Sequence, residues 1–151
     1  MANRRAFVRE MSRVVAYAER YGANFSVLYF DINGFKEIND RFGHAAGDAA
    51  LRQIAELLAE NIRESDIVSR LGGDEVGVIL AQADVAAAAE NAVSLSALIA
   101  ATPFEWESTS VPLSVSYGAY SFSGKKDAGE APQRADEAMY ENKQGRASNG
   151  S

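Results

Sequence analysis

Three carboxylates stand where two apolar runs of the sequence meet polar turns. Asp31 comes near the end of the run "FSVLYFDI", and Asp74 and Glu75 follow two glycines in "RLGGDEVGVIL". If the two runs are neighbouring strands, the three side chains converge at one edge of a sheet. Converging carboxylates repel one another unless they share a cation. Mg²⁺ suits such a site because it takes hard oxygen ligands, and with substrate phosphates it supports nucleotidyl transfer.

These residues also have a purely structural interpretation. Aspartate is common at strand ends and in turns, and glycine tolerates the positive φ that a tight hairpin requires. The spacing of the three acidic residues does not separate this interpretation from a metal site. The surrounding sequence has to decide between them.

The bulk composition limits the classes of function. The chain has 151 residues, of which 47% are hydrophobic, which fits one globular domain with its own core. Its net charge of −6 argues against a nucleic-acid polymer as partner but allows a nucleotide, because a metal ion neutralises phosphates locally. With no cysteine and one histidine, disulfides, thiolate sites and histidine-rich zinc sites are excluded. Without a signal peptide or a membrane-length apolar run, we expect a cytoplasmic protein with no direct membrane contact.

Apolar spacing predicts an α+β chain with the element order α, β, α, β, β, α, β, β, α. A first helix ends near Gly22, and the polar segment 33–48 leads to a helix whose apolar face runs from Leu51 to Ile62. Further elements are expected as two strands within 66–80, a helix over 84–101, strands "FEWES" and "VPLSVSYGAYSF" joined by "TS", and a last helix starting at Pro132. We expect residues 1–151 to form a single domain with a frayed tail at 147–151.

Several separated blocks of the sequence resemble the GGDEF family of diguanylate cyclase domains. They are "FDINGFKEINDRFGHAAGD", "RLGGDEV" and "ADEAMYENK", and they follow in family order between "NRRAF" and Lys143. The resemblance implies a palm-like βαββαβ core with a mixed, mostly antiparallel sheet flanked by helices. It implies that two GTP condense to cyclic di-GMP and two pyrophosphates, with Mg²⁺ as cofactor and Mn²⁺ as the alternative ion. It also implies a homodimer of domains, each of which holds one GTP.

The resemblance assigns metal-binding and catalytic roles at five positions. Asp31 and the backbone carbonyl of Ile32 match metal ligands. Asp74 matches a metal ligand that also serves as base for the 3′-hydroxyl, and Glu75 supports a second metal. Lys36 matches a phosphate-contacting lysine that stabilises the transition state. Without the family context, a solvated surface charge is the favoured interpretation of this lysine.

Other positions match residues that bind the substrate. Asn39 and Asp48 stand at guanine-binding positions, and a carboxylate is a suitable acceptor for the N1 and N2 donors of guanine. Backbone amides from Asn33 to Phe35 match a phosphate-binding turn, and Lys143 matches a lysine near the terminal phosphates. Outside the family context, the polar residues fit helix ends and turns equally well.

A second, product-inhibition site is implied by "RESD", which places Arg63 and Asp66 in an R-x-x-D pattern before the signature. An arginine stacks on or donates to guanine, and an aspartate accepts from its Watson–Crick edge. The pattern by itself is also typical of a solvated helix end.

The sequence departs from the family pattern at several places. Val76 stands where the signature ends in phenylalanine, and with Gly77 it predicts looser packing behind the carboxylates. Asn33 replaces a second aspartate, Lys143 and Arg146 are spaced more closely than usual, and no D-x-L-T-G segment or sensor domain precedes "NRR". The departures favour an alternative, a degenerate domain that binds GTP or cyclic di-GMP without turnover. A third interpretation is a synthase of a related cyclic dinucleotide.

Overall fold

The computed structural model describes residues 4–123 of the chain. In chain order, the elements are α1 (Arg4–Tyr21), β1 (Asn24–Ile32), α2 (Phe35–Phe42), α3 (His44–Glu60), β2 (Ile67–Arg70), β3 (Glu75–Ala81), α4 (Val85–Ala100), β4 (Phe104–Trp106), β5 (Thr109–Val111) and β6 (Val115–Ser123). The last predicted helix, with Lys143, and the tail at 147–151 lie outside the described residues. No helix within residues 4–123 is long and apolar enough to cross a membrane.

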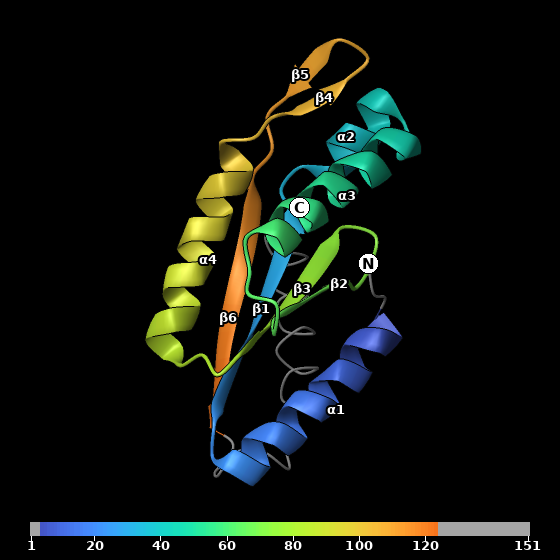
Figure 1. The fold of residues 1–151 in the computed structure, drawn as a ribbon. Helices are drawn as coiled ribbons and strands as arrows, with labels where there is room; N and C mark the ends of the chain where they lie inside the picture. Colours follow the sequence, from blue (N-terminus) through green and yellow to red (C-terminus); the bar gives the residue numbers. More distant parts are fainter. Residues whose placement is uncertain (1–3, 124–151) are drawn as a thin grey trace.

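A four-stranded antiparallel sheet forms the centre of the described structure. Its strand order is β2-β3-β1-β6, so the first strand along the chain lies inside the sheet between β3 and β6. β4 and β5 form a separate two-stranded hairpin that projects beyond the sheet (Figure 1). The predicted α+β class, with helices flanking a mostly antiparallel sheet, is confirmed.

Helices cover both faces of this sheet. Side chains alternate along each strand, so Leu28 and Phe30 of β1 join the core beneath α3 and α4. Val27 and Tyr29 point to the other face, where they pack with α1 (Figure 1). The sheet is therefore buried on both sides, which explains why β1 and β3 read as continuous apolar runs rather than alternating ones.

The first predicted helix is confirmed as α1. Its buried residues recur at helical spacing, and the chain leaves the helix at Gly22, whose φ of 67° favours glycine. The buried residues are Phe7, Met11, Val15 and Ala18. Among residues 4–123, α1 supplies the helical residues of the smaller core, and it packs against one face of the sheet.

The segment 33–48 differs from the prediction, which treated it as irregular. It contains the eight-residue helix α2 and the start of α3, which are separated by Gly43 at a φ of 97°. Only Ile38 of α2 is fully buried, so no apolar repeat of helical period is visible in so short a stretch. Helix α2 and the first turns of α3 bring the polar residues of this segment to the end of the sheet where β1 ends (Figure 1).

The turn that the sequence predicted within residues 104–122 was placed wrongly. Residues Thr109 and Ser110 belong to strand β5, and the connection lies at Glu107 and Ser108, which take φ of 45° and 70°. The expected long second strand is split at Pro112–Ser114 into β5 and β6. Proline lacks the backbone N–H that a sheet requires, which accounts for the interruption.

Candidate functional site

Two of the three predicted carboxylates lie side by side at one end of the sheet. Asp31 of β1 and Glu75 of β3 are directly paired across the two antiparallel strands. Their residues are 1% and 0% exposed, so both carboxyl groups are removed from solvent. Charges at such depth are costly unless other groups compensate for them. The structure therefore places two of the predicted metal ligands next to each other in a buried position.

Asp74 lies at the turn before β3 and is half-buried. Its carbonyl accepts a hydrogen bond from the Ile32 amide at 3.2 Å, and the Leu71 amide donates to the Glu75 carbonyl at 2.9 Å. These bonds fix the turn against the end of β1. Within residues 4–123, however, no three acidic or histidine side chains form a group that could hold a metal ion. Of the three carboxylates that were expected to cluster, Asp31 and Glu75 form a buried pair. Asp74 is next to Glu75 in the sequence but does not complete a group of three within the described part of the chain.

The donor set at this sheet end fits Mg²⁺. This ion is usually bound by one or two carboxylates, and waters and substrate phosphates complete its shell. The buried Asp31–Glu75 pair meets that requirement without a third carboxylate. The roles of Asp74 and of the Ile32 carbonyl as further ligands stay predictions.

The signature glycines do not take the conformation that the sequence suggested. Among the described residues, the glycines with positive φ are Gly22, Gly34 and Gly43, so Gly72 and Gly73 lie in the ordinary region. Residues 71–74 form a longer connection than a two-residue hairpin turn, so it needs no mirror-image backbone angles. A Cβ built at Gly73 meets no atom within 4 Å. The glycine therefore leaves open space over the turn, where a ligand can approach the backbone closely.

The predicted phosphate-binding turn is altered at its first residue. The Asn33 amide already donates to the Ser114 carbonyl at 2.9 Å, and its side chain bonds with Ser114 and Ser116. The free donors begin instead at the N-terminus of α2, where Gly34, at a φ of 68°, precedes Phe35 without a side-chain cap. The first amides of a helix lack internal partners and attract anions.

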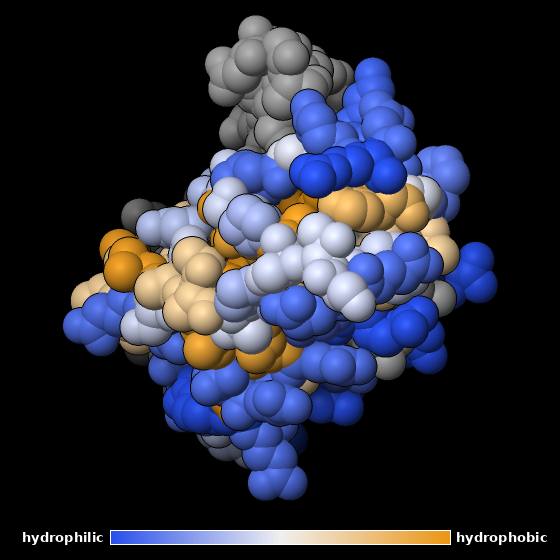
Figure 2. Space-filling view, turned by 90° about the horizontal axis from the view of Figure 1, so that it is seen from above, coloured by the Kyte–Doolittle hydropathy of each residue, from blue (hydrophilic) through white to orange (hydrophobic). Residues whose placement is uncertain are grey.

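The predicted substrate residues within the described part of the chain lie in α2 and in the first turns of α3. Lys36 is exposed in the first turn of α2, and Asn39 lies in its last turn. Asp48 is exposed in the first turns of α3. Figure 2 looks onto this end of the molecule, where hydrophilic residues surround smaller apolar areas. Asn39 and Asp48 thus lie in two consecutive helices at the same end of the sheet, and their guanine-binding role stays a prediction.

Arg70 is a site residue that the sequence reasoning missed. Its guanidinium contacts Asp48 at 3.0 Å and donates to the carbonyls of Gly72 and Gly73 at 3.2 and 3.5 Å. One side chain therefore joins the predicted guanine-binding carboxylate to the signature turn. The signal available was an arginine two residues before a glycine pair, but its partner in α3 is revealed only by the fold.

Arg63 and Asp66 lie at the opposite end of β3 from Glu75, roughly 20 Å away at the usual rise of a strand. The Asp66 carboxylate is almost buried, with 3% side-chain exposure, and accepts from the Arg63 and Ala81 amides at 3.0 and 2.9 Å. Arg63 also donates to the Ala81 carbonyl, while its side chain stays 59% exposed. Asp66 thus has a structural role here, and Arg63 is the member that a ligand can reach.

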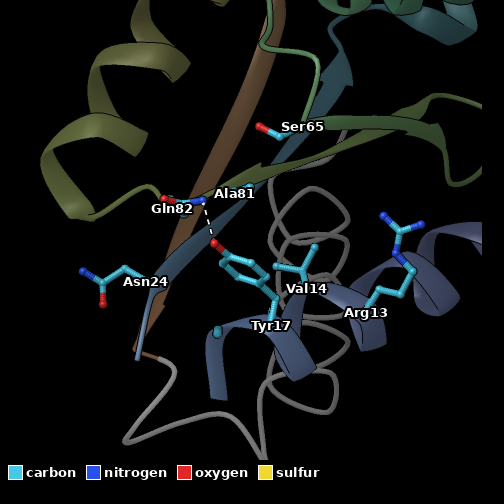
Figure 3. A pocket seen from close by; sticks show the side chains of 8 residues that line it. Arg13, Val14, Tyr17, Asn24, Ser65, Ala81 and Gln82 are labelled. Atoms are coloured by element: carbon cyan, nitrogen blue, oxygen red, sulfur yellow. Dashed lines mark hydrogen bonds between the residues drawn. The ribbon is translucent and has the colours of Figure 1, made fainter. Parts of the chain in front are cut away.

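A hollow of about 330 Å³ adjoins this turn (Figure 3). Ser65 and Ala81 line it on one side and Arg13 and Tyr17 of α1 on the other. Gln82, which has a positive φ of 53°, donates to the Tyr17 hydroxyl at 3.4 Å across it. The Arg63–Asp66 turn therefore borders a concave surface rather than a flat one.

Comparison with known proteins decides the family. The sequence profile of the family described as "Diguanylate cyclase, GGDEF domain" matches residues 1–149. The chain belongs to the GGDEF family. The diguanylate cyclase DosC from Escherichia coli is 37% identical to this GGDEF domain over 141 residues, covering 93% of this chain and 31% of DosC. The domain thus spans about a third of the length of that relative.

Solved GGDEF domains share the fold. The GGDEF domain of DgcB from Caulobacter crescentus, in complex with c-di-GMP, matches with a TM-score of 0.81 and 28% identity over 96% of this chain and 84% of that one. The active GGEEF domain of a diguanylate cyclase from Vibrio cholerae gives a TM-score of 0.79 and 30% identity over 95% and 92% of the two chains. The predicted palm-like core is therefore that of this domain.

Val76 is where this GGDEF domain departs from the signature. Its side chain is 0% exposed, and it is paired with Phe30 of β1 and Arg70 of β2. Gly77 is not a source of looseness, because a Cβ there lies 2.7 Å from Leu71 and 3.0 Å from Phe7. The loose packing that was expected behind the carboxylates is therefore absent on the face of the sheet that α1 covers, where Phe7 and Leu71 occupy the space beside Gly77.

We expect Val76→Phe to lower the free energy of unfolding by about 1–3 kcal/mol, because a larger side chain enters a filled core. Urea unfolding measures the change. Val93→Phe, at a position of α4 that is 59% exposed, is the matched control and should leave stability within about 0.5 kcal/mol. A Val76→Phe protein as stable as the original would show that the core retains space for the family's phenylalanine.

Proposed function

We propose that this GGDEF domain is a diguanylate cyclase that converts two GTP into cyclic di-GMP and two pyrophosphates. The observation that carries the proposal is the buried Asp31–Glu75 pair beside the signature turn, in a chain of this family. GTP and cyclic di-GMP are the proposed small-molecule partners, and the cytoplasm is the proposed compartment because GTP is available there.

The chemistry divides among the residues of this sheet end. The 3′-oxygen of one GTP attacks the α-phosphorus of the other, the bond to pyrophosphate breaks, and the hydroxyl proton passes to Asp74 as general base. When bound, Mg²⁺ supplies positive charge that polarises the α-phosphate. Asp31 and Glu75 hold that ion, while Lys36 and the first amides of α2 stabilise negative charge on the phosphates. Asn39 and Asp48 orient the guanine.

We propose that two copies of the domain face each other during catalysis. Each copy holds one GTP, and the two reactions that close the ring are equivalent, which suits a symmetric pair. The test is to incubate purified protein with GTP and Mg²⁺ and to follow pyrophosphate and dinucleotide by chromatography. Turnover per protein should rise with protein concentration. The absence of dinucleotide at high protein concentration would contradict the cyclase proposal.

A second candidate is a regulatory domain that binds GTP or cyclic di-GMP without turnover. The altered signature at Val76 favours it, and the DgcB domain, a structural relative, was solved in complex with c-di-GMP. In both candidates, we propose that Arg63 binds cyclic di-GMP and that Asp66 holds Arg63 in place.

We expect Arg63→Ala to weaken cyclic di-GMP binding by at least about tenfold, because a charged hydrogen-bond donor to the ligand is lost. Calorimetric titration with cyclic di-GMP measures the dissociation constant. Arg52→Ala, which removes an exposed arginine of α3, is the control for the change in net charge and should bind as before. Equal affinity of the Arg63→Ala and original proteins would place the ligand elsewhere.

A further inference from the structure

Gly47 is a buried glycine in the first turn of α3. Its amide donates to the Gly43 carbonyl at 3.3 Å, and its φ is not among the positive values of the described residues. The backbone here therefore accepts any L-residue. Glycine is unfavourable in helices compared with alanine, so local structure gives no reason for it. The reason has to lie in the space around its α-carbon.

That space is occupied by the side chain of Asn39. A Cβ built on Gly47 lies 1.9 Å from Asn39 Oδ1 and 2.9 Å from Asn39 Cγ, with the Phe35 ring at 3.1 Å. Atoms that are not bonded do not approach so closely. A side chain at position 47 and the Asn39 amide in its present place therefore exclude each other.

Asn39 has little freedom to adjust. Its carbonyl accepts from the Gly43 amide at 2.8 Å, and its neighbour Ile38 is buried in the core, so the backbone of α2 is held. Its Oδ1 is buried and has no hydrogen-bond partner among residues 4–123. No hydrogen bond within this part of the chain holds that oxygen. The bare α-carbon of Gly47 is what leaves room for the amide in this position.

Gly47 also precedes Asp48, the other predicted guanine-binding residue, which Arg70 holds at 3.0 Å. Asn39 therefore packs against Gly47, and the next residue of the same helical turn is Asp48. A carboxylate accepts from the N1 and N2 donors of guanine but faces an acceptor at N1 of adenine. The relative placement of the amide and the carboxylate then decides which purine fits.

We propose that Gly47 is a positioning residue that determines guanine specificity by holding the Asn39 amide beside Asp48. The proposal rests on the proposed function, because it takes the base bound by Asn39 and Asp48 to be guanine. Gly47 itself contacts no ligand. Its contribution is the absence of a side chain.

A mutant cycle in thermal unfolding tests the contact without any nucleotide. Gly47→Ala should lower Tm by roughly 3–8 °C in the original protein, because the methyl group displaces Asn39. In an Asn39→Ala background, the same substitution should leave Tm unchanged or raise it, since alanine favours the helix. Equal losses in the two backgrounds would assign the clash to another neighbour, such as Phe35, and overturn the proposal.

Equilibrium binding of GTP and ATP tests the specificity and requires no turnover. Gly47→Ala should weaken GTP binding by about tenfold or more while ATP affinity changes by less than about twofold, because only guanine loses a matched contact. An unchanged ratio of GTP to ATP affinity would overturn the inference. If the original protein prefers GTP and Gly47→Ala removes that preference, but neither protein forms dinucleotide, the cyclase proposal fails while this inference stands.

Discussion

Replacing Asp74 with asparagine is expected to slow cyclic di-GMP formation about 10²–10⁴-fold, the range over which a general base acts. The new side chain has nearly the same shape but carries no charge and accepts no proton. The Asp74 carbonyl, which accepts from the Ile32 amide at 3.2 Å, is untouched, so the turn should keep its place. The rate of pyrophosphate and dinucleotide release, followed by chromatography at saturating GTP, measures the loss.

The matched control for this substitution is Asp40→Asn. Asp40 is an exposed aspartate of α2, so its replacement changes the net charge equally without touching the signature turn. We expect its rate to stay within about twofold of the original, as for surface changes away from a site. If Asp74→Asn retained more than about a tenth of the original rate, Asp74 would not be the general base.

The sheet end with its carboxylates could be predicted from the sequence because strand pairing is regular. Two apolar runs of similar length, each with an acidic residue at its polar end, pair in only a few registers that keep both faces buried. The observed register of β1 against β3 sets Asp31 opposite Glu75. The positions of these side chains follow from local alternation and one long-range pairing.

The arrangement of α2 and α3 around Asn39 and Asp48 could not be predicted in the same way. α2 buries only Ile38, so its apolar pattern is too short to distinguish a helix from a polar loop. The contacts of Arg70 with Asp48 and of Gly47 with Asn39 join different elements, and no local pattern encodes them. Family resemblance identified Asn39 and Asp48, but the residues that hold them became visible only in three dimensions.

The backbone of the signature turn differs from what its two glycines predict. Paired glycines suggested positive φ, yet neither Gly72 nor Gly73 takes it. A ligand site needs open space as often as it needs an unusual backbone angle, and both needs select glycine. The sequence cannot separate these two reasons, whereas a Cβ built at Gly73, with no atom within 4 Å, does.

The signature hairpin is supported from behind by α1. Phe7 is 4% exposed, and its ring centroid lies 6.3 Å from that of Tyr29 in β1. A Cβ built on Gly77 lies 3.0 Å from the Phe7 ring and 2.7 Å from Leu71, which precedes the signature glycines. Phe7 thus occupies the place that a side chain at position 77 would take. The hairpin that carries Glu75 therefore depends on this ring for its packing.

We expect Phe7→Ala to lower the free energy of unfolding by about 3–5 kcal/mol, because it removes a buried ring and leaves a cavity against Gly77. Urea unfolding followed by circular dichroism measures the change. Val8→Ala, one residue further along α1 and 38% exposed, is the control and should cost less than about 1 kcal/mol. A Phe7→Ala protein that lost less than about 1 kcal/mol would show that α1 does not support the hairpin through this contact.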